Sequence, residues 1–351
     1  MGNRGSEMTT SGGLRERLAV ISASEQVHVA QEHFLDGIDK LIRPEPTATL
    51  SEAVIDYRQM LTLSIPERKR HLSWLIEGSN VMVFGLRGLG KTMYLLGLAA
   101  SLSTGRDFLK WKVTEPVGVL YVDGEMMLDE LRTRCTSLLP EPPTASLFFL
   151  TAELVYGMTK KDLVLTSQDM RDALTTILDE HPDIRVVILD NISCLFAGID
   201  EDKKRDWEPI NAWLIKLRHR GLATLLVHHA GKSGQQRGTS GREDSLDTVI
   251  HLDRPTGYEA TEGCHFELKF TKARSVKGEE VGPLDVRLED QGGKLTWAFK
   301  PLETSKEDQV RALLEEGIDG TSDIAEALGI NRSSAWRLKK RIENARQKGE
   351  K

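Results

Sequence analysis

Apolar and polar positions along this chain follow more than one pattern. From Asn80 onward, short apolar runs alternate with longer amphipathic stretches, which is typical of a parallel sheet covered by helices. The runs predict strands over Val81–Phe84, Val117–Val122, Leu147–Leu150, Val186–Leu189, Ala223–Val227 and Thr248–Leu252. The stretches between them predict helices over Lys91–Ser103, Met127–Leu139, Gln168–Glu180 and Trp207–Arg220. We therefore expect an α/β domain whose parallel strands are joined by right-handed crossovers.

After Gly257 the pattern changes to the alternation of antiparallel strands. It predicts strands over His265–Thr271, Pro283–Glu289 and Leu295–Phe299 that extend the same sheet. Residues 1–15 carry too little apolar surface to order themselves, and residues 48–62 predict a short helix. Residues 305–347 predict three helices after a linker. We expect three parts: an N-terminal tail and helical segment (1–62), an α/β domain (63–302) and a small helical domain (303–351).

Composition narrows the setting of the protein. With 351 residues, 39% hydrophobic and 28% charged, the chain has the make-up of a globular protein. It has no apolar stretch long enough for a membrane span and no apolar leader, so we expect a cytoplasmic protein. Three cysteines, Cys135, Cys194 and Cys264, are too few and too far apart for a disulfide framework or a zinc site. The net charge of −6 argues against a uniformly basic coat for nucleic acid.

The most specific motif follows the first predicted strand. Residues Gly85-Leu86-Arg87-Gly88-Leu89-Gly90-Lys91-Thr92 have the pattern G-x-x-x-x-G-K-T between a strand and a helix, which is the context of a phosphate-binding loop. Its backbone N–H groups would hold phosphate oxygens at a helix N-terminus. Lys91 would reach the β- and γ-phosphates, and Thr92 would bind Mg²⁺. The motif predicts a site for ATP and Mg²⁺, with Arg87 as a charged residue beside the phosphates or a neighbouring subunit.

Two further strands end in carboxylates. Asp190 ends an apolar run, at the edge of a parallel sheet where ligands bind, so it is the candidate partner of the metal. Glu125 follows another strand and is the candidate general base that polarises the attacking water. Asp123 competes for this role, and both carboxylates could instead cap the following helix.

These motifs together carry a family resemblance. Their order, followed by a strand that ends in His228-His229, resembles the RecA/DnaB-type ATPases and, more closely, the RepA-like hexameric helicases of plasmids grouped as AAA_25 domains. The segments HHAGKSG and RGTS, which begin at His228 and Arg237, are similar to the sensor strand and DNA-facing loop of that family. The resemblance covers roughly residues 65–290 and implies a RecA-like ATPase domain.

The resemblance also implies roles for individual residues. One of His228 and His229 would sense the γ-phosphate, while the other packs against the sheet because adjacent strand residues face opposite sides. The loop of residues 231–245 would hold single-stranded DNA through its backbone, or would simply be a solvated loop. A strand-end pair would reach the γ-phosphate of a neighbouring subunit, or would be an ordinary surface pair. The candidate DNA-binding side chains of the loop are Lys232, Arg237 and Arg242, and the strand-end pair is Lys272 and Arg274.

The C-terminal part reads as a helix-turn-helix. Ile324, Ala325 and Leu328 would face inward, and Gly329 would form the turn. Residues 331–351 carry eight Lys/Arg against two Asp/Glu, a local charge of +6 that leaves −12 for the rest of the chain. This basic end would contact DNA phosphates, or would be a protein-interaction module with a basic tail. The candidate DNA-binding residues here are Arg332, Ser333, Ser334 and Arg337.

We therefore expect an ATP-hydrolysing, ring-forming helicase or translocase, with a hexamer as the expected ring. It would act on single-stranded DNA in replication of a plasmid, phage or mobile element and bind duplex through its C-terminal helices. The alternatives are a RecA-like DNA-binding ATPase of recombination, repair or defence that does not unwind, and an ATP-switched transcriptional regulator. A small-molecule kinase fits least, because no lid or acceptor pocket is evident in the sequence.

Overall fold

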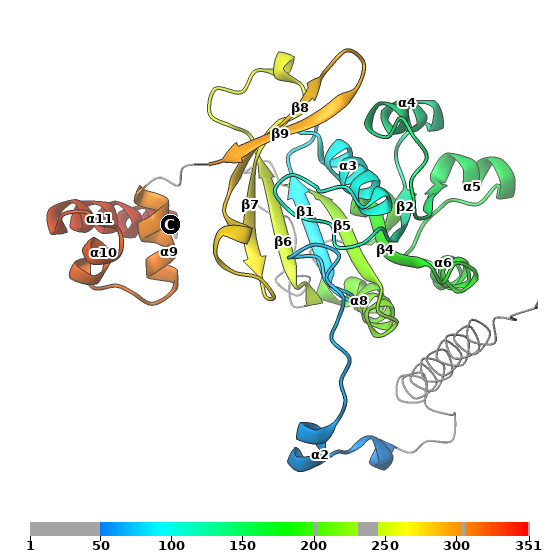
Figure 1. Cartoon of the computed structure of the whole chain (residues 1–351), viewed down its shortest axis with the longest axis horizontal. Coiled ribbons are helices and arrows are strands. Elements are labelled where there is room, and N and C mark those ends of the chain that lie inside the picture. Colours follow the sequence, from blue (N-terminus) through cyan, green and yellow to red (C-terminus); the bar gives the residue numbers. More distant parts are fainter. Residues whose placement is uncertain (1–49, 200–202, 231–244, 303–305, 350–351) are drawn as a thin grey trace, which may run out of the picture. The chain divides into compact units, whose positions relative to one another are not determined.

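The computed structural model of the chain describes residues 50–199, 203–230, 245–302 and 306–349 (Figure 1). The chain divides into two compact units, residues 1–67 and 68–351. Within the described residues the second unit contains a nine-stranded sheet in the order β3-β2-β4-β5-β1-β6-β7-β8-β9. The predicted α/β fold with a mostly parallel sheet is confirmed.

Six parallel strands form the larger part of this sheet. Each coincides, within one or two residues at either end, with a strand that the apolar runs predict. They are β1 (Asn80–Gly85), β2 (Gly118–Asp123), β3 (Leu147–Thr151), β4 (Ile184–Asp190), β5 (Ala223–His229) and β6 (Thr248–Asp253). The predicted antiparallel extension is also present, as β7 (His265–Ala273), β8 (Leu284–Asp290) and β9 (Leu295–Pro301). We call the side where β1–β6 end the carboxyl edge and the opposite side the amino edge.

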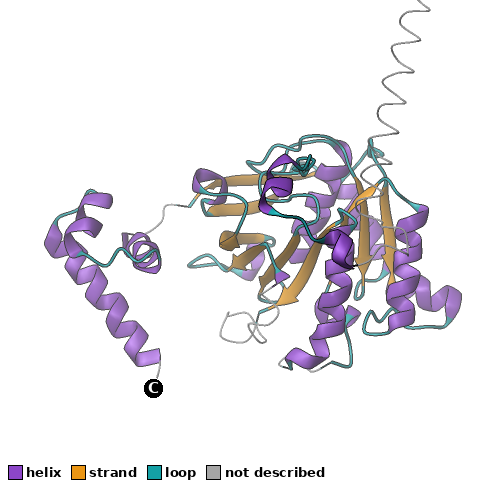
Figure 2. Ribbon diagram, turned by 90° about the horizontal axis from the view of Figure 1, so that it is seen from below, coloured by secondary structure: helices purple, strands orange, loops and turns teal. Residues whose placement is uncertain are grey.

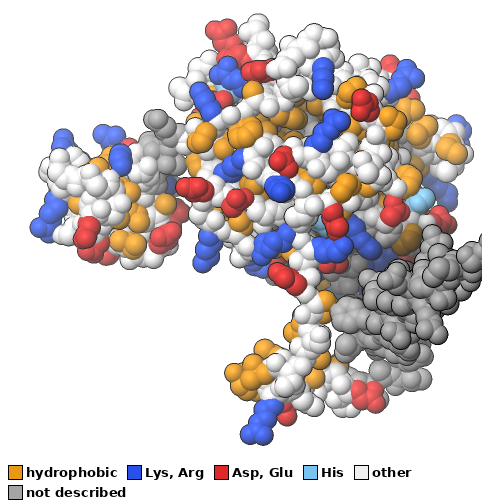
Figure 3. All heavy atoms as spheres, in the orientation of Figure 1, with side chains coloured by type: hydrophobic (Ala, Val, Ile, Leu, Met, Phe, Trp, Pro, Cys, Tyr) orange, Lys and Arg blue, Asp and Glu red, His pale blue; other side chains and the backbone are white. Residues whose placement is uncertain are grey.

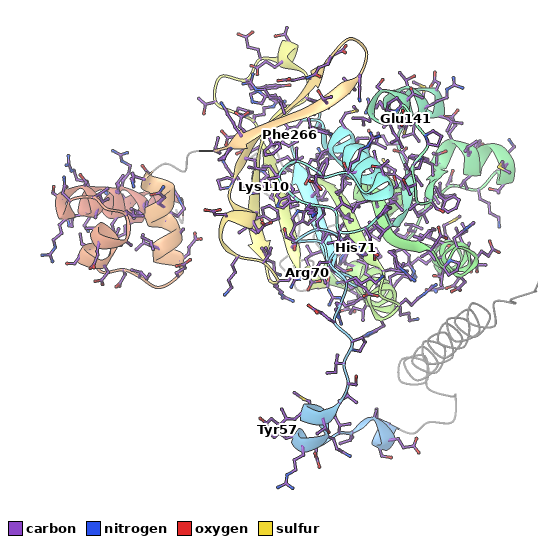
Figure 4. All side chains as sticks on the ribbon, viewed as in Figure 1. Tyr57, Arg70, His71, Lys110, Glu141 and Phe266 are labelled. Carbon is purple, nitrogen blue, oxygen red and sulfur yellow. The ribbon has the colours of Figure 1, made fainter. Side chains whose placement is uncertain are left out.

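Helices cover both faces of the parallel strands (Figure 2). On one face, which we call the α3 face, side chains such as Val83 and Tyr121 pack with α3 (Lys91–Thr104) and α4 (Leu128–Leu138). Phe266 of β7, labelled in Figure 4, is buried in the same core. The other face, the α8 face, is covered by α6 (Gln168–Glu180), α7 (Ile192–Leu195) and α8 (Lys204–His219). Strand alternation therefore assigns each strand residue to one of two cores.

Two α-helices of this unit were not predicted from the sequence, the four-residue α7 and the longer α5 (Ala152–Thr159). Helix α5 directly follows β3, with Thr151 as its N-cap. Its side chains Leu154, Tyr156 and Met158 are largely exposed. Apolar side chains in solvent do not produce the one-sided pattern by which an amphipathic helix is recognised.

The described part of the first unit differs from the single helix predicted over residues 48–62. It contains a 3₁₀ turn at Leu50–Ala53 and a separate helix α2 (Tyr57–Thr62). Asp56 explains the break, because its side chain accepts a hydrogen bond from Gln59 N while Asp56 N donates one to Gln59 Oε1, and this capping box starts a new helix. Tyr57, labelled in Figure 4, is 73% exposed. The tail predicted at residues 1–15 lies outside the described residues.

Three C-terminal helices are present where three were predicted. They are α9 (Lys306–Glu315), α10 (Thr321–Ala327) and α11 (Arg332–Gly349), and they enclose a small core that includes Val310, Ile324 and Ala335. Residues 303–305 of the predicted linker lie outside the described part. None of the helices in the described ranges is both long and apolar enough to cross a membrane.

Candidate nucleotide site

The G-x-x-x-x-G-K-T loop connects β1 to α3 at the carboxyl edge. Gly88 and Gly90 have φ values of 74° and 95°, in the left-handed region that side-chain-bearing residues avoid. A Cβ on Gly90 would also come within 2.2 Å of the Sγ of Cys264, so glycine is required there for space as well. Gly90 is the N-cap of α3 and offers no side chain to cap it. The first N–H groups of this helix are therefore available to an anion.

A cavity of about 730 Å³ opens beside this loop. It is lined by the loop, by the ends of β2, β4 and β5, and by the start of α4. The lining side chains that carry charge or can ionise are Arg87, Lys91, Asp123, Glu125, Glu130, Arg134, Asp190, Cys194 and His229.

Lys91 is buried inside this loop. Its Nζ donates hydrogen bonds to the carbonyl oxygens of Gly85 at 3.0 Å and Leu86 at 2.7 Å. Burial lowers the pKa of Lys91 to about 8, and the nearby Asp190 and Glu125 oppose part of this shift. An ammonium whose burial outweighs the effect of its nearby carboxylates is a favourable partner for the phosphates of a nucleotide.

Asp190 lies at the end of β4 and is only 4% exposed. Its Oδ2 accepts a hydrogen bond from the hydroxyl of Tyr121 at 2.7 Å, and its carboxylate also bonds to Thr92. Burial raises the pKa of Asp190, while these two hydrogen bonds and Lys91 act in the opposite direction. The structure thus brings together Thr92 and Asp190, the two residues expected at the metal.

These two oxygen donors fit Mg²⁺. Magnesium is usually held by one or two protein oxygens together with phosphate oxygens and waters, rather than by a complete protein cage. Across the described ranges, no group of three His, Cys, Asp or Glu side chains forms such a cage. A metal that arrives with a nucleotide therefore matches this pair of residues.

Asp123 and Glu125 have different environments. Asp123 is 2% exposed, and its Oδ1 accepts backbone hydrogen bonds from Glu125 at 3.0 Å and Met126 at 2.6 Å. Burial raises its pKa to about 6 against these bonds. The Glu125 side chain is 63% exposed and lines the cavity. Asp123 shapes the turn, and Glu125 is the carboxylate that this turn presents to a ligand.

The two histidines of β5 face opposite sides of the sheet. His228 is fully buried and lies in register with Phe84, whose side chain belongs to the α8 face. His229 lies in register with Gly85 and lines the cavity, with its Nε2 4.0 Å from Glu125 Oε2. Burial, Lys91 and Arg87 lower the pKa of His229 to about 4, so its ring is neutral at pH 7.

Lys272 and Arg274 are placed away from this cavity. They lie at the end of β7, which runs antiparallel to β6, so Ala273 pairs with the first residue of β6 at the amino edge. Lys272 is half-buried, whereas the Arg274 side chain is 54% exposed and its Nη1 lies 3.9 Å from Asp247 Oδ1. The structure does not bring this pair to the phosphate loop of its own chain.

The candidate DNA-binding residues fall in two places. Lys232, Arg237 and Arg242 lie outside the described residues. At the start of α11, Arg332, Ser333 and Arg337 are exposed and Ser334 is half-buried. Asn331 caps this helix by accepting a hydrogen bond from Ser334 N at 2.8 Å. Figure 3 shows Lys/Arg and Asp/Glu side chains interspersed over the visible surface, rather than one uniformly basic coat.

Two residues that contact the candidate metal ligand and the candidate base were not singled out from the sequence. Tyr121, which binds Asp190, reads as an ordinary apolar strand residue, although it shares its strand face with Asp123. Asn191, whose Nδ2 donates a hydrogen bond to Glu125 Oε2, reads as a turn residue after a strand. The sequence position of Asn191 could have identified it, since Asn191 directly follows Asp190 at the end of a strand on the carboxyl edge.

Comparison with known proteins gives one family match. The family model AAA_25, described as an AAA domain, matches residues 45–235, which is more than half of the chain.

Several curated relatives are DNA repair proteins named RadA. The chain is 24% identical to RadA of Rickettsia typhi over 247 residues, covering 68% of this chain and 48% of that protein. It is 25% identical to RadA of Campylobacter jejuni over 185 residues, or 51% and 34% of the two chains. The chain thus spans less than half the length of these relatives.

A solved structure, a KaiC-like protein from Pyrococcus horikoshii, superimposes with a TM-score of 0.43 at 14% identity. The match covers 64% of this chain and 91% of that one.

Proposed function

Because the chain belongs to the AAA_25 family of RecA-like P-loop ATPases, we propose that it is an ATP-hydrolysing, ring-forming motor that moves on or unwinds single-stranded DNA. Lys91 and the loop glycines bind the phosphates, and Thr92 and Asp190 hold Mg²⁺. The metal neutralises phosphate charge when it is bound. Glu125 takes the proton of the attacking water, and neutral His229 reports on the γ-phosphate.

The observation that carries the ring is the separation of the two sets of residues. The phosphate loop lies at the carboxyl edge of the sheet, whereas Arg274 lies at the amino edge. A guanidinium that stabilises charge on the transferred phosphoryl group must reach it directly. In the proposed assembly Arg274, with Lys272 beside it, acts on the site of a neighbouring copy, and each complete site forms between two subunits. A hexamer is the proposed closed form.

The DNA-binding parts complete this proposal. Lys232, Arg237 and Arg242 follow β5 and its His229, so a change at the γ-phosphate can pass to them through the chain itself. They would hold the backbone of single-stranded DNA, while Arg332, Ser333, Ser334 and Arg337 of the helix-turn-helix would contact duplex DNA. Replication of a plasmid, phage or mobile element, in the cytoplasm, is the proposed setting.

A second candidate function is a DNA repair or recombination ATPase that binds DNA without unwinding it. The relatives named DNA repair protein RadA favour this function. It would use the same nucleotide site and the same proposed contact between subunits.

A strand-displacement assay on forked DNA separates them. The motor should show hydrolysis stimulated by single-stranded DNA together with displacement of the annealed strand, and Lys91→Ala should remove both. Stimulated hydrolysis without displacement, at saturating ATP and protein, would favour the repair function. Sequence-specific duplex binding with no stimulation by single-stranded DNA would instead indicate an ATP-switched regulator.

A further inference from the structure

Asn191 links the candidate base to the strand that carries the candidate metal ligand. It follows Asp190, is 2% exposed and lines the nucleotide cavity. Its Nδ2 donates a hydrogen bond to Oε2 of Glu125. Its Oδ1 accepts a hydrogen bond from Cys194 N at 3.2 Å, so that Asn191 is also the N-cap of α7. One side chain thus connects the carboxylate of Glu125 to a helix terminus.

The cap determines which end of the amide faces Glu125. The N–H of Cys194 donates to Oδ1 of Asn191 as well as to the backbone carbonyl of Asn191, both at 3.2 Å, and of the two ends of the side-chain amide only the oxygen can accept. The amino group must then point the other way, toward the carboxylate. Asn191 therefore presents a donor, and only a donor, to Glu125.

The Glu125 side chain depends on such a hydrogen-bond donor to hold its orientation. Its side chain is 63% exposed, and a glutamate with that freedom occupies several rotamers. The hydrogen bonds of Asp123 fix the backbone of the turn, at Glu125 N and Met126 N. Asn191 and His229 both lie next to Oε2, so Oε1 is the oxygen that can be directed at a water near the γ-phosphate.

We propose that Asn191 is a positioning residue that holds the Glu125 carboxylate in the orientation required for proton transfer. This inference rests on the proposed function, since Glu125 has a proton to accept only if the chain hydrolyses ATP. It requires that Asn191 affect turnover and leave ATP binding unchanged, because the amide contacts the base and not the phosphate loop.

Two substitutions separate this role from helix capping. Asn191→Ser keeps a good capping oxygen but is too short to reach Glu125, and turnover should fall about tenfold. Asn191→Asp keeps the shape and the cap but places a carboxylate against Glu125, and turnover should fall about 100-fold. Asn331→Ser, which changes the capping asparagine of α11, is the matched control and should leave ATP turnover unchanged.

The measurements are kcat, KM, the equilibrium affinity for ATP with Mg²⁺, and the Mg²⁺ concentration for half-maximal activity, all compared with Glu125→Gln. The expected result is a graded loss of kcat with the affinities for ATP and Mg²⁺ retained. If Glu125→Gln is inactive but both Asn191 variants turn over like the wild type, the positioning role is wrong and the proposed function stands. Loss of ATP or Mg²⁺ affinity in both variants also overturns the positioning role. Full activity of Glu125→Gln would show that Glu125 is not the general base, and the positioning role of Asn191 would then be wrong as well.

Discussion

Burial destabilises the charged form of the Lys91 side chain. Its pKa is lowered to about 8 by burial, and only backbone carbonyls lie within hydrogen-bonding distance of its Nζ among the contacts described. A polyphosphate bound beside it would raise that pKa again, because an anion favours the protonated ammonium. Binding must then be coupled to proton uptake.

The coupling gives a prediction for ATP affinity as a function of pH. Affinity should be constant below pH 8 and fall by up to about tenfold per pH unit above it, until the pKa of the bound state is reached. Calorimetry in buffers of different ionisation enthalpy measures the proton uptake directly. In Lys91→Arg the guanidinium stays charged throughout, so its affinity should not vary with pH over this range. A wild-type affinity that is equally flat from pH 7 to 10 contradicts the lowered pKa.

The assignment of the base is tested by a pair of isosteric changes. Glu125→Gln should lower turnover by about 100-fold or more while ATP still binds, because the proton acceptor is lost. Asp123→Asn should keep turnover within about threefold, since its amide oxygen can still accept the two backbone hydrogen bonds that shape the turn. Steady-state hydrolysis and nucleotide binding are the measurements. The opposite ranking of the two variants would make Asp123 the base.

At the level of single residues, the sequence predicts what a motif or a strand end specifies. Lys91, Thr92 and Asp190 follow from spacing and from the strand that precedes them. The contacts of Tyr121 and Asn191 do not, because a hydrogen bond between β2 and β4 depends on which strands become neighbours. The placement of the two histidines is partly predictable. Strand alternation predicts that His228 and His229 face opposite sides of the sheet, but it does not predict which of them lines the site.

At the level of elements, the apolar runs predict the six parallel strands, because buried parallel strands are apolar on both faces, and alternation predicts the antiparallel strands β7–β9. Helix α5 was not predicted, since its exposed Leu154 and Met158 give no amphipathic signal. The order of the strands also goes beyond the sequence. The antiparallel direction of β7 relative to β6 puts the end of β7 at the amino edge, opposite the phosphate loop.

The position of the end of β7 predicts complementation between two inactive variants. Arg274→Ala should bind ATP normally and hydrolyse it at least about tenfold more slowly, while Lys91→Ala should be inactive. Mixed together, they should recover part of the wild-type rate, because the intact loop of one variant meets the intact Arg274 of the other.

The control for this mixture is Arg287→Ala, which removes an exposed arginine from β8. It should hydrolyse ATP at the wild-type rate, alone or mixed with wild type. If mixtures of Arg274→Ala and Lys91→Ala show only the activity of the two separate proteins, Arg274 does not act between subunits.

At the level of the whole molecule, charge is distributed unevenly. Residues 331–351 carry +6 in a chain whose net charge is −6. The three helices α9–α11 have a hydrophobic core of their own, so their removal leaves the cores of the sheet intact.

Removal of residues 303–351 should therefore weaken duplex binding strongly and reduce its dependence on salt. Hydrolysis stimulated by single-stranded DNA should persist, because the nucleotide site and the loop after β5 remain. Fluorescence anisotropy with duplex and single-stranded oligonucleotides at several salt concentrations measures both effects. Unchanged duplex affinity in the truncated chain would assign these helices to protein contacts instead.

The placement of the phosphate loop and Arg274 on opposite edges of one sheet has an arithmetic consequence. A contact that joins the carboxyl edge of one copy to the amino edge of the next is head-to-tail, and such contacts close into a circle or continue as a filament. If Arg274 completes the site of the next copy, as proposed, an open row of n copies contains n − 1 complete catalytic sites and a closed ring of n copies contains n. The rate of hydrolysis per subunit is therefore lower in open rows, whose end subunits lack a neighbour. A stepwise rise in this rate as protein concentration increases would indicate that the rows close into rings.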